Sequence, residues 1–531
     1  MSIISDALKY SRLAFDLRDY LRNTISLEES KRAVSGRLQN RERNFLSLVQ
    51  KGIYENPNSP YLKLLRMAGC EFGDIEYLVN QDGIEPTLHK LLAEGVYLSW
   101  EEFKGKRDIV RGGSRFQFRA TDFDNPFLPG HYRVQSSGTR SAGTRTIFDL
   151  NHQLEKNYYH LPMLEANDAL DVPMGLWHPG LPSAAGIGAV LTYWKVGKPV
   201  ARWFSLTTES QVQASLRDRL ATRYIIHGSR LWGAKLAKPE YVGLTEAIKV
   251  ARWMATTKQQ FGSCSLSCFV SPAVKVCQAA IESGLDIQGT RFFVAGEPLT
   301  EAKRQQIEAA GASVIPKYYI TEVGFIGCGC PGSYAADDIH LFRDSMALIQ
   351  RQRHVEHSDV CVNALLFTTL LPSAPKMMLN VESDDYGVVE TRSCGCPFGQ
   401  LGFGEHLYNI RSFAKLTGSG MTILGSDFVR ILEEVLPRKY GGAPTDYQLL
   451  EEEDSRGQTH LSLIISPSVG VLDDGDVVMT VLGELRRDAH GGKLATALWA
   501  QANTLQVKRT YPISSSGKIM TLHLIKNSQG V

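Results

Sequence analysis

The feature that most constrains the fold of this chain is a strand–helix–strand pattern between residues 292 and 320. The stretch FFVAGEPL is apolar and ends in glycine and proline, which is typical of a strand followed by a turn. TEAKRQQIEAAG has the pattern of a helix, and ASVIPKYYI that of a second strand. Because this alternation builds sheets covered by helices, we predict a layered α/β domain.

The expected secondary structure differs on the two sides of this unit. Residues 1–130 look mainly helical, and strands are expected at ALLFTTLL (364–371) and DYGVVETR (385–392). Further on we expect a helix at SDFVRILEEVL, a strand in HLSLIISPSV, a long helix around 475–503 and a short C-terminal strand. A boundary near Arg411 then divides the chain into a large domain, 1–410, and a small α+β domain, 411–531.

Composition excludes several classes of protein. The 531 residues include 58 basic and 56 acidic side chains, so the net charge of +2 predicts neither nucleic-acid nor membrane-surface binding. Charged residues interrupt the N-terminal segment, which rules out a signal peptide, and the run CVNALLFTTLLP is too short to span a bilayer. The nine cysteines are expected to be reduced thiols or metal ligands in a cytoplasmic protein.

A loop rich in glycine, hydroxyls and arginine follows Val134, in VQSSGTRSAGTRTIFDL. Glycines let backbone N–H groups approach phosphate oxygens, and arginine adds positive charge. The spacing is not that of a Walker loop. A phosphate-binding loop and a plain solvated hairpin turn are both compatible with the stretch alone.

Four more segments follow the loop in a recognisable order: AGEP (295–298), YITE (319–322), ESDDYG with Asp385, and PISSSGK, which ends at Lys518. Together with the loop they resemble the adenylate-forming superfamily of acyl-CoA synthetases, adenylation domains and luciferases, over roughly residues 80–525. Within it, GVYLSWEEFKG, LLFTTLLPSAPKM and the cysteine pairs described below are most similar to the phenylacetate-CoA ligase-like branch. The resemblance implies a large N-terminal α/β domain and a small mobile C-terminal domain.

The implied reaction is attack of a carboxylate on the α-phosphorus of ATP, with loss of pyrophosphate, followed by transfer of the acyl group from AMP to an acceptor. Two anions must be neutralised and aligned in such a step. The resemblance assigns Lys518, Thr321 and Glu322 to catalysis, with Glu322 as the Mg²⁺ ligand and Tyr319 against adenine. It assigns the remaining nucleotide contacts to Ser136, Ser137, Gly138, Thr139, Gly143, Thr144, Arg145, Ala295, Gly296, Glu297, Pro298, Asp385 and Arg411.

The sequence departs from the family pattern in three places. Asp384 replaces the usual glycine before the ribose-binding aspartate, and the loop is one residue longer around Arg140. After Arg411 the chain reads SFAK where a hinge pair of aspartates is expected. These changes keep open a non-catalytic, nucleotide-binding regulatory protein, while the intact Lys518 favours an enzyme.

Two CxC pairs, GCGCPG and RSCGCPFG, are the second chemical signal. Thiolates and imidazole are zinc ligands, and four of them close a tetrahedral structural site. By resemblance to the phenylacetate-CoA ligase-like branch, we expect Zn²⁺ at Cys330, His340, Cys394 and Cys396, with Cys328 as a substitute for Cys330. Buried free cysteines are the alternative.

The segment MGLWHPGLPSAAGIG corresponds to the acyl pocket of the family and places Trp177, His178 and Gly180 at the substrate. Aromatic walls favour a flat acid, so we expect an aryl or arylacetic acid. Core packing of Trp177 and surface exposure of His178 are the alternatives. CoA is the expected acceptor, although a carrier protein, an amine or a hydroxyl stays open, as does a homodimer.

Overall fold

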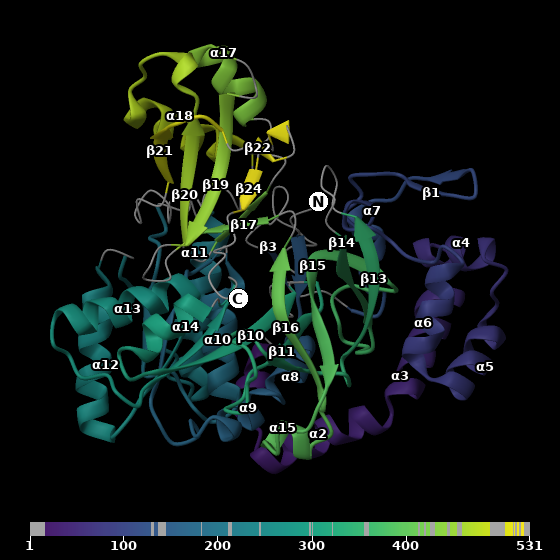
Figure 1. The fold of residues 1–531 in the computed structure, drawn as a ribbon. Helices are drawn as coiled ribbons and strands as arrows, with labels where there is room; N and C mark the ends of the chain where they lie inside the picture. The colour runs from purple at the N-terminus through teal and green to yellow at the C-terminus, as the bar shows by residue number, and fades with distance from the viewer. Residues whose placement is uncertain are drawn as a thin grey trace.

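A computed structural model shows the arrangement of the chain (Figure 1). It describes residues 16–128, 132–135, 145–181, 183–210, 215–243, 246–296, 299, 301–320, 322–354, 361–412, 415–418, 421–424, 431–442, 446–453, 459–488, 505–512, 514–515, 518–519 and 522–524.

A sheet of 12 strands runs through the large part of the molecule, in the order β13-β14-β15-β16-β12-β11-β10-β9-β8-β5-β6-β7. One half is parallel and consists of β5 (Met174–Trp177), β6 (Arg202–Ser205), β7 (Pro239–Tyr241), β8 (Ser265–Phe269), β9 (Arg291–Ala295) and β10 (Ser313–Ile320). The predicted strand–helix–strand unit is confirmed as β9, α14 (Glu301–Glu308) and β10, with β9 and β10 parallel.

The other half of the sheet is antiparallel. It consists of β11 (Gly324–Cys328), β12 (Ile339–Leu341), β13 (Met346–His354), β14 (Cys361–Thr369), β15 (Val381–Thr391) and β16 (Glu405–Ser412). The strands expected around 364–371 and 385–392 are confirmed as β14 and β15. β10 joins the two halves, because it is parallel to β9 and antiparallel to β11.

Helices cover both faces of the parallel half (Figure 1). Phe292 and Val294 of β9 belong to one hydrophobic cluster, with α12 (Ala247–Phe261) and α13 (Val270–Glu282). Phe293, between them, belongs to another, with α9 (His160–Ala166) and α10 (Ala184–Lys195). Since successive side chains of a strand point to opposite faces, this alternation confirms the layered α/β class.

The helices of the segment before residue 130 are α2 (Leu27–Gln39), α3 (Arg41–Val49), α4 (Pro60–Met67), α5 (Phe72–Asp82), α6 (Ile84–Ala93) and α7 (Trp100–Phe103), followed by a hairpin of β1 (Ile109–Arg111) and β2 (Ser114–Phe116). From α3 onward, the segment before residue 130 packs against the antiparallel half and shares its hydrophobic cluster, whereas Val34 of α2 belongs to the cluster of α9 and α10. Within the described residues, no helix is both long and apolar enough to cross a bilayer.

The C-terminal region stands above the large sheet in Figure 1 and has a sheet of its own. That sheet contains β21 (Leu505–Arg509), β20 (Thr459–Ile465), β19 (Tyr447–Glu453) and β24 (Leu522–Leu524), with α17 (Leu436–Tyr440) and α18 (Asp474–Asp488) beside it. The helix expected around 475–503 is seen as α18 as far as Asp488, and residues 489–504 lie outside the described part. The boundary expected near Arg411 falls within β16, the last strand of the large sheet.

Candidate active site

Asp385, one of the expected nucleotide residues, lies beside the junction strand β10. Tyr318, on β10, donates a hydrogen bond from its hydroxyl to Oδ2 of Asp385, on β15, at 2.6 Å. Burial, together with the Asp385 carboxylate, raises the pKa of Tyr318 well above its usual value, so the phenol stays protonated and remains a donor. On the next strand, β16, Ser412 pairs with Asp385 and Arg411 with Tyr386, which sets the backbone of Arg411 beside this pair.

Tyr319, which the sequence had assigned to adenine, does not make this contact. Its ring stacks on Phe325 at 4.3 Å between centroids and 7° between planes, and its hydroxyl lies 3.5 Å from Nε2 of His160. Successive residues of a strand face opposite ways, and the pairing with β11 shifts register between Tyr318 and Tyr319. Tyr318 is therefore the aromatic residue beside Asp385, and the sequence reasoning missed it because it counted back from Thr-Glu to the nearer tyrosine.

Glu322 follows β10 and is a buried carboxylate that stays ionised. It forms an ion pair with Lys104, which follows α7, and only 3% of its surface is exposed. Burial acts to raise the pKa of Glu322, but the Lys104 ammonium, its hydrogen bond and Lys376 more than offset this, so the pKa is lowered. An anionic oxygen donor in this place fits Mg²⁺, which prefers carboxylate and water oxygens. Lys104 is a site residue that the sequence reasoning did not single out.

Several expected residues can be described only in part or not at all. Ala295 ends β9, and Gly296 follows with φ 85°, a conformation that favours glycine. The loop 136–144 joins β3 (Tyr132–Gln135) and β4 (Arg145–Phe148), an antiparallel hairpin in which Gln135 pairs with Arg145. Lys518 lies in β23 (Lys518–Ile519), paired with β22 (Ser514–Ser515). The side chains of Arg145, Arg411 and Lys518 lie outside the described part, as do Ser136, Ser137, Gly138, Thr139, Gly143, Thr144, Glu297, Pro298 and Thr321.

The end of β5 holds the segment expected at the acyl pocket. Trp177 has no exposed surface, and its indole donates to the carbonyl of Val242 at 2.9 Å, so of its two interpretations the structure shows core packing. His178 is buried rather than on the surface, with Nε2 3.2 Å from Oγ of Ser267.

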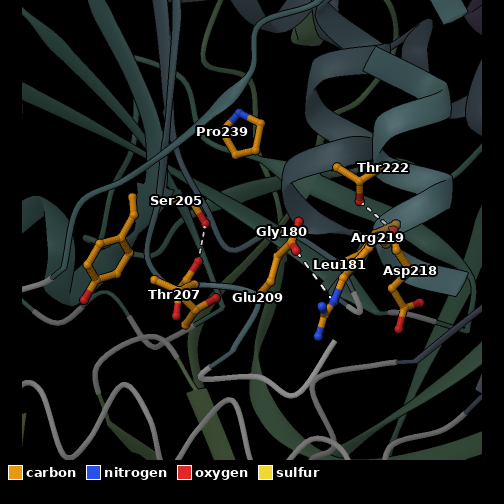
Figure 2. Close-up of a pocket in the computed structure, with 11 residues that line it drawn as sticks. Gly180, Leu181, Ser205, Thr207, Glu209, Asp218, Arg219, Thr222 and Pro239 are labelled. Carbon is orange, nitrogen blue, oxygen red and sulfur yellow. Dashed lines mark hydrogen bonds and ion pairs between the residues drawn. The ribbon is translucent and has the colours of Figure 1, made fainter. Parts of the chain in front are cut away.

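Gly180 lines a pocket of about 220 Å³ beside α11 (Leu216–Arg223) (Figure 2). The pocket is bounded by the ends of β6 and β7, with hydroxyl and charged groups from Ser205, Thr207, Glu209, Asp218 and Arg219. It therefore opens at the carboxyl edge of the parallel strands, where ligands of open α/β sheets bind. Trp177 and His178 are not among the residues that line it.

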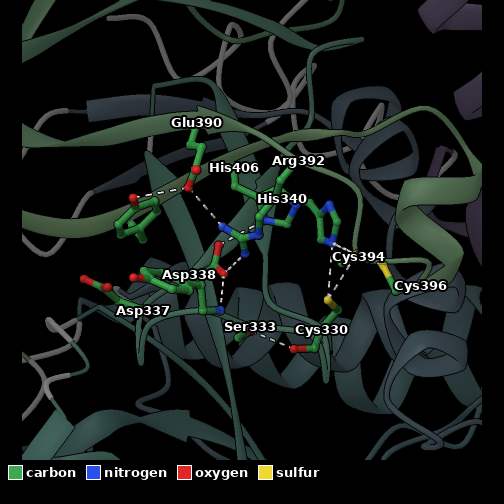
Figure 3. A network of polar contacts seen from close by, with 12 residues as sticks. Cys330, Ser333, Asp337, Asp338, His340, Glu390, Arg392, Cys394, Cys396 and His406 are labelled. Atoms are coloured by element: carbon green, nitrogen blue, oxygen red, sulfur yellow. Dashed lines mark hydrogen bonds and ion pairs between the residues drawn. The ribbon is translucent and has the colours of Figure 1, made fainter.

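The four expected zinc ligands converge at the other end of β11 (Figure 3). Nε2 of His340 lies 3.3 Å from Sγ of Cys330, 3.4 Å from that of Cys394 and 3.2 Å from that of Cys396. The Sγ atoms of Cys330 and Cys394 are 3.8 Å apart. Ligand atoms around a tetrahedral zinc are separated by roughly 3.5–3.8 Å; the S–S distance matches this, and the three N–S distances are a few tenths of an ångström shorter. Cys328 is not part of the group.

The surroundings of the cluster also fit a metal. Nδ1 of His340 lies 2.6 Å from the carbonyl oxygen of Phe403, which leaves Nε2 to face the three sulfur atoms. The hydrogen bond with Cys330 is the largest cause that lowers the pKa of Cys396, to about 3, which favours the thiolate form that zinc binds. Asp338, which pairs with Arg392 and with Nδ1 of His406, borders the cluster in Figure 3 and was not foreseen.

Comparisons with known proteins support the fold. No protein-family model matches the sequence, and a search of the curated proteins gave no match. Among solved structures, 2-hydroxyisobutyryl-CoA ligase in complex with 2-HIB-AMP and CoA is similar over 95% of this chain and 91% of its own, at 13% identity and a TM-score of 0.51. An anthranilate CoA ligase, AuaEII, matches 73% of this chain and 65% of its own at 12% identity and a TM-score of 0.30. The Brucella canis acyl-CoA synthetase matches 76% of this chain and 64% of its own, at 15% identity and a TM-score of 0.33. The chain therefore shares the fold of the 2-hydroxyisobutyryl-CoA ligase structure.

Proposed function

We propose that this chain activates a carboxylic acid with ATP and transfers the acyl group from the resulting acyl-adenylate to CoA. The observation that carries the proposal is the arrangement at β10, where Tyr318 holds Asp385 and the ionised Glu322 follows within four residues. The likeness in fold to a ligase whose structure holds an acyl-AMP and CoA supports it. The finer assignment, to the phenylacetate-CoA ligase-like branch, rests on the sequence segments alone.

In this proposal an oxygen of the acid attacks the α-phosphorus of ATP, the bond to the β-phosphate breaks, and pyrophosphate leaves. Asp385 accepts hydrogen bonds from the ribose, and Tyr318 rather than Tyr319 lies on the adenosine side. Glu322 holds Mg²⁺, which neutralises the phosphate oxygens. Lys518 supplies positive charge at the reacting oxygens, and the loop 136–144 with Arg145 holds the β- and γ-phosphates.

We also propose that Cys330, His340, Cys394 and Cys396 bind a structural Zn²⁺. All four positions are filled by protein ligands, which leaves no open coordination site for catalysis. The role we assign to the ion is to tie the turn after β11 to the turn after β15.

An aromatic acid remains our proposal, on altered grounds. Trp177 is in the core, so it supports no pocket wall. Tyr319, stacked on Phe325, offers an aromatic face that is 38% exposed. A carrier protein, amine or hydroxyl in place of CoA is the second candidate, and a nucleotide-binding regulatory protein is the third, because SDD and SFAK depart from the family pattern.

The test is ATP–pyrophosphate exchange over a panel of acids, followed by thioester formation with CoA. We expect exchange that requires both an acid and Mg²⁺, and CoA thioester with the acid that gives the fastest exchange. Exchange without formation of a CoA thioester would favour a carrier protein, an amine or a hydroxyl as the acceptor. Nucleotide binding without exchange, for every acid tested, would favour the regulatory protein.

A further inference from the structure

Lys317 is a lysine without a carboxylate partner among the described residues. It lies on β10, and its ammonium donates a hydrogen bond to Oγ of Ser267, on β8, at 2.9 Å. Burial lowers the pKa of Lys317 to about 8. Buried ammonium groups are usually paired with an anion, and no carboxylate of the described residues pairs with this one.

His178 adds an unused donor. Oγ of Ser267 lies 3.2 Å from Nε2 of His178. Burial, together with Lys317, lowers the pKa of His178 to about 3, so the ring is neutral. With the serine hydroxyl donating to Nε2 while its oxygen accepts from Lys317, the ring proton is on Nδ1. That atom is buried and has no hydrogen-bond partner in the described part of the chain.

Further basic groups lie on the other side of His160, whose pKa is lowered to about 3 by burial together with Lys317 and Lys156. Burial lowers the pKa of Lys156, on α8 (Leu150–Asn157), to about 8, and both ring nitrogens of the buried His152 lack partners among the described residues. A Cβ atom at Gly324 would come within 2.7 Å of Cδ of Lys156 and 2.9 Å of Nε2 of His152. Glycine, at φ +102°, therefore leaves room for the two basic side chains.

The same face of β10 is open to solvent at Tyr319. Strand alternation puts Lys317 and Tyr319 on one face and Tyr318 on the other. Tyr319 is 38% exposed, although burial raises its pKa well above the usual value.

Lys317 and Glu322 have different partners. Lys317, within β10, donates to Ser267 on β8, whereas Glu322, beyond the end of β10 at Ile320, pairs with Lys104. With the phosphates held near Glu322, the far end of an acid is the part that reaches Lys317.

We propose that the acid carries a second anionic group, as a dicarboxylic acid does, and that Lys317 binds it. The inference rests on the proposed function, because it concerns the substrate of that reaction. The second carboxylate of a diacid would accept hydrogen bonds from the ammonium of Lys317. A monoacid of the same shape, with a methyl group in place of that carboxylate, would accept none. Charge-assisted hydrogen bonds of this kind correspond to a preference of about 10- to 100-fold.

The experiment compares kcat/KM in ATP–pyrophosphate exchange for matched acids, such as benzene-1,4-diacetic acid against 4-methylphenylacetic acid and glutaric against valeric acid. We expect the wild-type protein to prefer the diacid of at least one pair about 10-fold or more. Lys317→Met should remove the preference while leaving kcat for the monoacid within a few-fold. Lys258→Met, which removes an ammonium paired with Asp286 elsewhere on the surface, should leave the preference unchanged.

Three outcomes overturn the inference. Equal kcat/KM for diacid and monoacid, with Lys317→Met leaving the ratio of the two values unchanged, would show that Lys317 does not bind a second anionic group. The proposed function would stand. An equal loss of kcat for all acids in Lys317→Met would place the lysine at the reacting carboxylate instead. No exchange with any acid would reject the proposed function itself. Matching thermal midpoints of wild type and Lys317→Met would show that the comparison is made between folded proteins.

Discussion

Glu322 keeps a negative charge in a place where few carboxylates do. Its side chain and that of Lys104 are 5% and 9% exposed, and the two form an ion pair. Either charge left alone at this depth is unfavourable, because neither water nor a partner would compensate it. In the proposed reaction the same carboxylate serves Mg²⁺, so Lys104 holds it ionised before the metal and nucleotide arrive.

We expect Lys104→Met to lower the free energy of unfolding at pH 7 by about 3–5 kcal/mol, because it leaves Glu322 buried and unpaired. Since the pKa of Glu322 is lowered in the folded protein, this stabilisation is present at neutral pH and is lost as the pH falls through that pKa. Urea unfolding of wild type and mutant at pH 7 and pH 4 checks both points. Adding Glu322→Gln should recover most of the stability, and failure to do so would mean that the pair is not the cause.

Arg145 and Arg140 are rival candidates for the phosphate contact. The β3–β4 hairpin puts Arg145 at the base of the loop, opposite Gln135, and Arg140 lies within the loop sequence. We expect Arg145→Ala to raise the KM for ATP about 10-fold or more while leaving the order of preference among acids unchanged. Arg140→Ala is the matched control. The larger effect identifies the contact, and no effect in either would reject the phosphate loop.

Some single residues could be predicted from the sequence and others could not. Asp385 and Glu322 are carboxylates within recognisable motifs, so their type and position indicate a binding role. The choice between Tyr318 and Tyr319 depends on which way each faces on β10, and a register shift in the pairing with β11 is not visible in the sequence. Trp177 suits a pocket or a core equally by type, and only its hydrogen bond to Val242 and its full burial decide for the core.

At the scale of elements, the cysteine cluster joins two turns that are far apart in the chain. Cys330 follows β11 and His340 lies on β12, while Cys394 and Cys396 follow β15. The two CxC pairs were visible in the sequence, but the choice of Cys330 over Cys328 depends on where β11 ends. Cys328 is the last residue of that strand and pairs with His340 through the backbone.

We expect about one zinc per chain in protein purified without chelator, measured by elemental analysis. Cys394→Ser should lower that value, while Cys328→Ser, the matched control, should not. Removing the metal should lower the thermal midpoint before it lowers exchange activity, because closing a loop of more than 50 residues stabilises the fold rather than the chemistry. Metal-free protein with wild-type stability would rule out the structural site.

Elements of the parallel half were predictable because local signals agree with the fold. The 292–320 segment carries its own turn and helix signals, and the helix ends shortly before Gly311, which has a φ of 73°. Strand order and the parallel-to-antiparallel change at β10 were not predictable, because they depend on pairings between distant segments. Lys104, from the helical N-terminal segment, was missed for the same reason.

At the scale of the whole molecule, the proposed reaction assigns the C-terminal region a catalytic residue, Lys518. We expect Lys518→Ala to slow acyl-adenylate formation by about 10²-fold or more in single turnovers, with unchanged unfolding, because the cation at the reacting oxygens is lost. With preformed acyl-adenylate, thioester formation should persist if the C-terminal region swings away after adenylation. Adenylation at the wild-type rate in the mutant would remove Lys518 from the site.

The central claim is that the acid and AMP become joined through one oxygen of the acid. The most direct measurement uses an acid labelled with ¹⁸O in both carboxylate oxygens, with ATP, Mg²⁺ and CoA, and determines the mass of the AMP released. The proposed route transfers one labelled oxygen to the phosphorus, so AMP should gain one ¹⁸O and the thioester should keep the other. Unlabelled AMP, or ADP as the nucleotide product, would contradict the account.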